Sequence, residues 1–85
     1  MITQVFSVYD QRAAVYLPPM YMQTKGFALR SFEDAINDQS HQFARHAGDF
    51  TLVHLGEFDD CSGKFSLLDM PNILINGLEC VKNKE

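Results

Sequence analysis

The hydrophobic pattern begins with a β-rich run and a short return. Residues 2–9 are rich in β-branched and aromatic types, which favours a strand, and apolar side chains fall on both of its faces, as in a central strand. A turn at 10–12 then leads into 13–17, which is expected to pair antiparallel with the first run. Pro18 and Pro19 end this second strand, because proline donates no hydrogen bond to a sheet ladder.

The middle of the chain has the periodicity of an amphipathic helix. Apolar side chains recur at helical spacing from Ala28 to Ile36, and polar side chains occupy the other positions. Thr24 is a suitable N-cap, so the pattern predicts a helix over residues 25–37 that lies against a sheet. Residues 38–48 are polar and irregular, with one helical turn expected to open at Ser40.

A second hairpin is predicted over residues 49–65. A run of Phe, Thr, Leu and Val meets a cluster of turn formers at 59–63, and an apolar run resumes at Phe65. The next stretch is ambiguous. Asp69 and Pro71 suit the start of a helix, and apolar residues at 73–81 fit helical spacing, although 73–75 suits a short strand equally well. We favour a short helix there and expect a frayed end over residues 82–85.

These elements predict one α+β domain over residues 1–85. The order is hairpin, helix, hairpin (ββαββ), which gives a small antiparallel sheet with one main helix packed on one face and a short C-terminal element. Such a sheet leaves edge strands exposed, and pairing across an edge is a simple route to a homodimer.

Composition narrows the function classes. The chain has 85 residues, of which 46% are hydrophobic, so it is expected to fold into one small core. Seven basic and 11 acidic residues give a net charge of −4, which opposes binding to nucleic acid mainly through counterion release. The first residues do not resemble a signal peptide, and no apolar run reaches the length of a membrane span.

The residues that carry chemistry do not form a recognisable catalytic or metal motif. Cys61 and Cys80 are expected to be reduced thiols in a cytoplasmic protein, and the three histidines lack zinc-ligand spacing relative to them. A pairing of Cys61 with His54 as nucleophile and base has no supporting pocket. Asp59 and Asp60 are more typical of a hairpin turn than of a calcium loop. We therefore predict no catalytic residue, metal or cofactor.

A local surface that binds nucleic acid is compatible with the negative net charge of the whole chain. Arg12 and Lys64 are placed at the two predicted hairpin tips, which would form a positive patch if both tips pointed the same way. Tyrosines could supply faces on which bases stack. The candidate phosphate contacts are Arg12, Lys25, Arg30, Arg45 and Lys64, and the candidate stacking residues are Tyr9, Tyr16 and Tyr21.

A set of short words in fixed order resembles a known family. The words are SVYD, YLPP, ALRSF, IND, DFTL and GEFDD followed by Gly63, and they span roughly residues 5–65. In this order they resemble the small nonstructural protein of gokushoviruses, which are microviruses, that is, phages with single-stranded circular DNA. The resemblance implies an early non-virion protein of the infected bacterial cytoplasm that binds DNA and turns genome replication toward single-stranded synthesis and packaging. It implies no functional residues.

Two functions of different classes follow from these observations. The first is a non-enzymatic phage protein that binds single-stranded or replicating DNA. The second is an adaptor or dimeric assembly factor that contacts replication or procapsid proteins through its acidic hairpin and a sheet edge, without touching DNA. Binding to single-stranded DNA at low salt distinguishes them.

Overall fold

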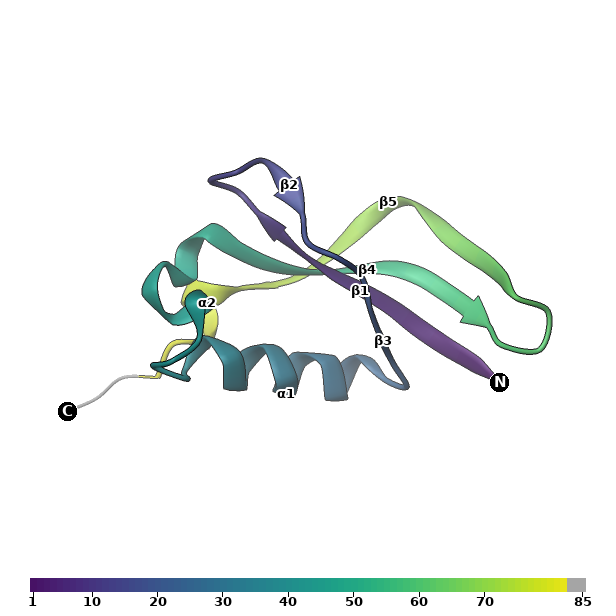
Figure 1. Ribbon diagram of the computed structural model, residues 1–85, viewed down its shortest axis with the longest axis horizontal. Helices are drawn as coiled ribbons and strands as arrows, with labels where there is room; N and C mark the ends of the chain where they lie inside the picture. Colours follow the sequence, from purple (N-terminus) through teal and green to yellow (C-terminus); the bar gives the residue numbers. More distant parts are fainter. Residues whose placement is uncertain (83–85) are drawn as a thin grey trace.

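A computed structural model describes residues 1–82 of the chain. A curled antiparallel sheet of five strands lies against one main helix, which confirms the predicted α+β fold (Figure 1). The strands are β1 (Ile2–Asp10), β2 (Val15–Tyr16), β3 (Met20–Met22), β4 (Phe50–Asp59) and β5 (Lys64–Asn76). The helices are α1 (Lys25–Ile36), α2 (Gln42–Arg45) and α3 (Gly77–Cys80), and a 3-10 turn, η1, spans Ala47–Asp49. None of these helices is long and apolar enough to cross a membrane.

The strand order is β2-β1-β4-β5, and β3 also pairs with β1, on the side away from β4. The central position of β1 confirms the expectation drawn from its apolar residues on both faces: Val5, Phe6, Ser7 and Val8 are all buried. The predicted return strand over 13–17 is shorter than expected, because only Val15 and Tyr16 pair with β1 before Pro18 and Pro19 interrupt the ladder. The chain then pairs with β1 again at β3.

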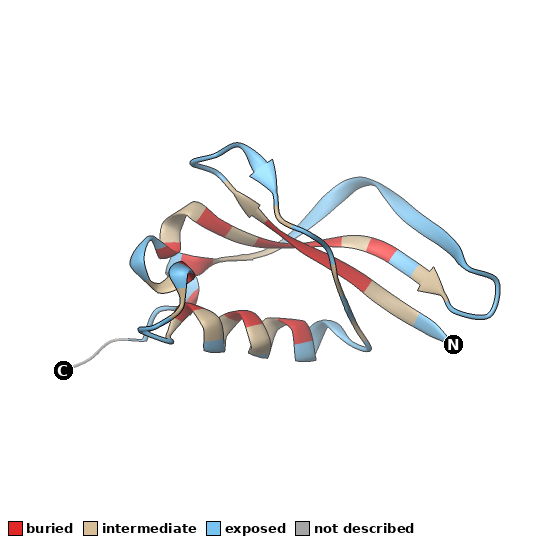
Figure 2. Cartoon of the chain, in the orientation of Figure 1, coloured by how far each residue is buried: buried red, intermediate tan, exposed pale blue. Residues whose placement is uncertain are grey.

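Helix α1 begins and packs as its sequence predicts. The Thr24 hydroxyl oxygen accepts a hydrogen bond from the Phe27 amide at 3.1 Å, and Ala28, Phe32 and Ile36 are buried. They meet Phe6, Val8, Phe50 and Leu52 of the sheet in one core (Figure 2). The predicted turn after α1 exists as α2, but its N-cap is His41 and not Ser40, because Ser40 bonds to the carboxylate of Asp38 instead.

The prediction of a helix from Asp69 through residues 73–81 is wrong for its first part. Strand β5 continues through Pro71 to Asn76, and only Gly77–Cys80 is helical. Residues 68–71 have no partners in β4, since the register passes from Gly56↔Leu67 to His54↔Asn72. A proline is tolerated in such an unpaired segment, where no ladder hydrogen bond is lost.

The C-terminal element is attached to the rest of the fold by two asparagines. Asn76 caps α3, and its Nδ2 donates to the carbonyls of Gly48 and Phe50 and to the Thr51 hydroxyl. Asn37, which follows α1, donates to the carbonyl of Cys80 and accepts from the Lys82 amide. Lys82 is therefore held in place by its backbone. The expected fraying of residues 83–85 lies outside the described residues.

Candidate nucleic-acid interface

The two faces of the sheet differ because only one of them is covered by α1. Phe6 and Val8 point to α1, so alternation along β1 places Thr3, Val5, Ser7 and Tyr9 on the other face. Residues directly opposite in an antiparallel pair share a face. This face, which we call the open face, therefore also carries the residues opposite to these in neighbouring strands: Tyr16, Tyr21, Thr51, Val53, Gly56, Phe58, Phe65, Leu67 and Ile73.

Two tyrosines stand together at one end of the open face. Tyr9 and Tyr16 are register partners, with ring centroids 4.7 Å apart, and Tyr16 is half exposed. They border a shallow, open hollow of about 360 Å³ that β5 closes on its other side. Its lining includes Tyr9, Gln11, Tyr16, Thr51, Met70 and Ile73. The hollow combines aromatic and aliphatic walls with an amide and hydroxyl groups, which suits a flat heteroaromatic ring.

Three aromatic rings form a second cluster at the other end of the open face. Phe58 and Phe65 face each other across the hairpin at 4.8 Å, and Tyr21 lies 6.0 Å from Phe58 and 6.4 Å from Phe65. Tyr21 belongs to β3, on the far side of β1, so its ring has to reach across the sheet. Gly56 has no side chain to obstruct this reach, and Val5 beneath it is only 2% exposed.

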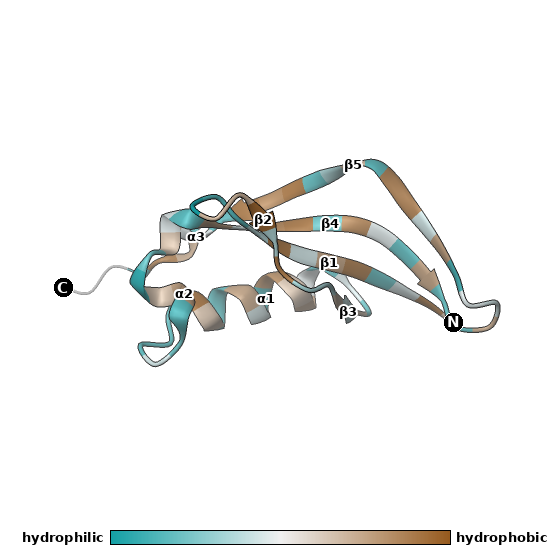
Figure 3. Ribbon diagram, turned by 45° about the horizontal axis from the view of Figure 1, so that its top comes forward, coloured by the Kyte–Doolittle hydropathy of each residue, from teal (hydrophilic) through white to brown (hydrophobic). Residues whose placement is uncertain are grey.

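Ser7 lies between the two aromatic clusters and has a structural partner. Its hydroxyl donates to the Leu17 carbonyl at 2.7 Å, and Ser7 is 1% exposed. The chain between β2 and β3 therefore covers the middle of the open face, and the exposed rings lie at its two ends. Figure 3 shows the sheet turned toward the viewer, with apolar segments along β1, β4 and β5.

The structure brings the three predicted tyrosines onto one face but does not gather the five predicted cations. Arg12 lies in the β1–β2 turn and Lys64 at the start of β5, at opposite ends of β1 (Figure 1). The two hairpin tips therefore do not point the same way. Lys25 and Arg30 are exposed on α1, and Arg45 ends α2, so these three belong to the helical layer.

Phe58 and Phe65 were not selected from the sequence as stacking residues, although a signal was present. Each lies one residue outside the pair Asp59↔Lys64 that closes the hairpin. A predicted hairpin with this turn therefore places the two rings opposite each other, on one face. Gln11, Met70 and Ile73 carried no comparable signal, because their proximity depends on the path of β5 after residue 67.

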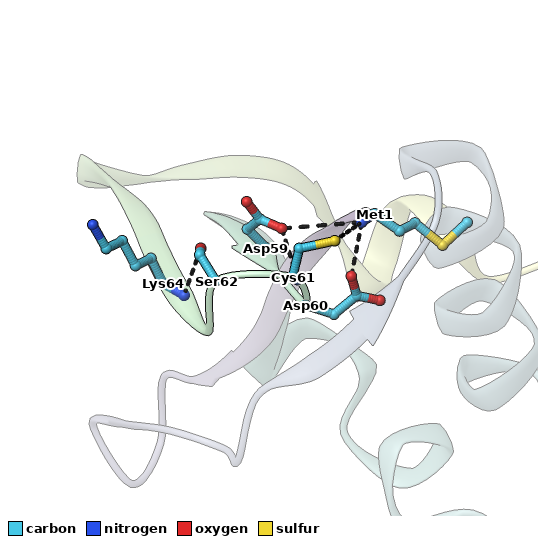
Figure 4. A network of polar contacts seen from close by, with 6 residues as sticks. All are labelled: Met1, Asp59, Asp60, Cys61, Ser62 and Lys64. Carbon is cyan, nitrogen blue, oxygen red and sulfur yellow. Dashed lines mark hydrogen bonds and ion pairs between the residues drawn. The ribbon is translucent and has the colours of Figure 1, made fainter.

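The acidic hairpin tip is occupied by the chain's own cation. The α-ammonium of Met1 lies 2.7 Å from Asp60 Oδ1, 4.0 Å from Asp59 Oδ1 and 3.4 Å from the Cys61 sulfur (Figure 4). The hydrogen bond to Asp60 raises the pKa of the Met1 ammonium, and the same contact lowers the pKa of the Asp60 carboxyl. Asp59, Asp60 and Cys61 are close enough together to hold a metal ion, and the Met1 ammonium compensates one of their two negative charges.

The cysteines and histidines have separate positions. Cys61 is exposed in the turn beside Met1, whereas Cys80 is buried beneath α1, where desolvation and then the nearby carboxylates of Glu33 and Glu79 raise the pKa of its thiol. His54 is buried opposite Phe6, and its Nε2 lies 2.8 Å from the Gln4 side-chain oxygen. His41 Nδ1 accepts from the Phe43 amide as the cap of α2.

Comparison with known proteins defines the class to which this fold and surface belong. The chain matches the family described as Phage ORF5 protein over residues 3–80. This range includes every strand, apart from Ile2 at the start of β1. It is therefore a phage protein and a member of that family. No curated protein and no solved structure matches the chain.

Proposed function

We propose that this phage protein binds single-stranded DNA through the open face, without catalysing a reaction. The observation that carries the proposal is the alignment of Tyr9, Tyr16, Tyr21, Phe58 and Phe65 on one face of the sheet. Every nucleobase has a π-face that stacks on an aromatic side chain, so such a surface accepts a single strand of any sequence.

The electrostatic contribution to this binding is small. Arg12 and Lys64 flank the two ends of the open face, and Lys25, Arg30 and Arg45 lie on the helical layer. With at most two phosphate contacts per chain, the slope of log K against log salt is expected to be about −1.4 or shallower. Affinity therefore depends mainly on stacking, which is consistent with the net charge of −4.

The biological role that we propose follows from the resemblance to gokushovirus nonstructural proteins. In the cytoplasm of the infected bacterium, the protein coats or marks newly exposed single strands and helps to direct replication toward single-stranded genomes and their packaging. Phage replication or procapsid proteins are the partners that such a role requires.

Fluorescence anisotropy of a labelled single-stranded oligonucleotide, titrated with the full chain at several salt concentrations, tests the proposal. Tyr16→Ala and Tyr21→Ala are each expected to weaken binding by about 5- to 150-fold, the range for loss of one stacked base. Phe27→Ala is the matched control, because Phe27 is an equally exposed aromatic residue on α1. Equal losses in all three variants would contradict the proposal.

The second candidate is a protein adaptor without DNA contact. It is favoured by the large exposed apolar side chains of β5, where Met70 is 76% and Ile73 is 71% exposed. Surfaces of this kind are more often used for protein partners than left to solvent. Absence of any DNA binding at low salt in the same titration would support the adaptor.

A further inference from the structure

The part of the sheet next to the chain's N-terminus extends beyond α1. It consists of the start of β1, the end of β4 and the start of β5, and Figure 1 shows these three segments reaching past the first turn of α1. We call it the β-arm. Phe58 and Phe65 of the β-arm contact each other and Tyr21 of β3, and every residue from Lys64 to Ile73 is exposed. A short sheet with an uncovered apolar face has little stability of its own.

The exposed surface of the chain is large for its mass. The accessible surface is 5850 Å², compared with about 5100 Å² for a compact monomer of 9.7 kDa. The excess of about 750 Å² is comparable to the area that each partner contributes to a stable interface, about 800 Å².

The outer edge of β5 is the place where this partner is expected to bind. Within the described residues, β5 ends the strand order and pairs only with β4. From Phe65 to Leu68 the edge has no charged residue and no proline, which are the usual devices that prevent edge pairing. The stretch is apolar except for Ser66. Its apolar side chains are exposed: Phe65 is 51%, Leu67 63% and Leu68 45% exposed.

We infer that β5 pairs antiparallel with β5 of a second copy of this chain, about a two-fold axis at Ser66. A two-fold axis perpendicular to the sheet keeps the open faces of both copies on the same side. Odd-numbered residues of one β5 must therefore face odd-numbered residues of the other, and even-numbered residues must face even-numbered ones. In this register Ser66 of one copy lies opposite Ser66 of the other, and Phe65 of each copy lies opposite Leu67 of the other.

Charge also fits this register. Lys64 of each copy comes within one residue of Asp69 of the other, so opposite charges lie at both ends of the paired segment. A strand of another protein would have to reproduce this pattern, whereas a second copy supplies it by symmetry. The dimer joins the two open faces into one continuous surface, and its formation does not depend on DNA binding.

Sedimentation equilibrium of the full chain without DNA, from about 1 to about 100 μM, tests the inference over the range where a micromolar dimer dissociates. A species of twice the 9.7 kDa chain mass is expected. Leu67→Lys is expected to shift the mass to that of the monomer while the circular dichroism spectrum is kept. Leu78→Lys is the matched control, since Leu78 is a leucine of similar exposure on α3, and it is expected to remain dimeric.

A cross-linking experiment tests the register. In a Cys61→Ser background, Ser66→Cys places two thiols beside the two-fold axis, and a short bis-maleimide is expected to link them into a covalent dimer. Ser40→Cys, on the polar segment after α1, is expected not to cross-link. A monomeric wild-type chain, a dimeric Leu67→Lys variant, or equal cross-linking at positions 40 and 66 would each overturn the inference.

Discussion

The α-ammonium of Met1 donates a hydrogen bond of 2.7 Å to Asp60, which is 59 residues away in the sequence. Strand β1 begins beside the turn that joins β4 to β5, because Ile2 is the register partner of Asp59. The first residue of the chain therefore closes the hairpin tip, and the Met1 carbonyl also accepts a hydrogen bond from the Asp60 amide at 3.2 Å (Figure 4).

This contact predicts a pH dependence of stability. The pKa of the Met1 ammonium is raised by its contacts with Asp60 and Cys61, so its contribution is complete below the usual pKa of about 8 and is lost as the pH rises through the raised value. The pKa of Asp60 is lowered, so its contribution is lost as the pH falls. Thermal unfolding from pH 7 to 10 should show a decline that Asp60→Asn reduces, while the part that comes from the raised pKa of the Cys80 thiol remains. Asp34→Asn, an exposed carboxylate on α1, should leave the decline unchanged.

Gly56 is the position on β4 where a side chain is least tolerated. Its φ is +153°, and a Cβ atom there would lie 2.3 Å from the Ser66 carbonyl oxygen. We expect Gly56→Ala to lower the free energy of unfolding by at least about 2 kcal/mol. Gly63→Ala, with a φ of +75° but open space around it, should cost about 1 kcal/mol. Urea unfolding of both variants gives the order of their stabilities, and a larger loss at Gly63 would contradict this account of Gly56.

Asn76 should be a major stabilising residue of the C-terminal third. Asn76→Ala removes the N-cap of α3 and leaves the Gly48 and Phe50 carbonyls without their side-chain donor. A loss of about 2 to 3 kcal/mol is expected in chemical unfolding. Asn72→Ala changes an exposed asparagine of the same strand and should stay within about 0.5 kcal/mol of the wild type. Similar losses for both variants would show that the Asn76 hydrogen bonds contribute little.

The two cysteines should differ strongly in reactivity. Cys61 is exposed in the turn, whereas Cys80 is 5% exposed and its thiol pKa is raised by burial. Because the thiolate is the reactive form, a maleimide should label Cys61 quickly at neutral pH and Cys80 only when the protein unfolds. Mass spectrometry of the labelled peptides identifies the sites. Rapid labelling of Cys80 in the native protein would show that α3 opens away from α1.

Local signals in the sequence account for much of the fold. The Thr24 cap, the apolar stripe of α1 and the turn formers at 59–63 all act over a few residues, and each of these elements is present. The path of β5 could not be derived in this way. Whether 73–75 continues as a strand depends on pairing with Leu52 and Val53, about 20 residues earlier, and helical spacing alone does not decide it. The start of α3 did carry a signal, since Asn76 and Glu79 have the spacing of a capping box.

The candidate site was predictable only in part, for the same reason. Tyr9, Tyr16 and Tyr21 were selectable by residue type, but their common face depends on the break at Pro18 and Pro19, after which β3 pairs with β1 in a new register. The dispersion of the cations follows from the antiparallel pairing of β1 with β4, which sends the two hairpin tips to opposite ends of the sheet.

The pairing of β1 with β4 also constrains how the protein is made. β1 is the central strand, yet its longest partner begins at Phe50. A ribosome that has released only the first half of the chain has therefore exposed β1 with short partners in β2 and β3 on one edge and none on the other, and contacts of long sequence separation form slowly. The long β1–β4 ladder, and with it the complete core, therefore forms only after residues 50–59 have left the ribosome.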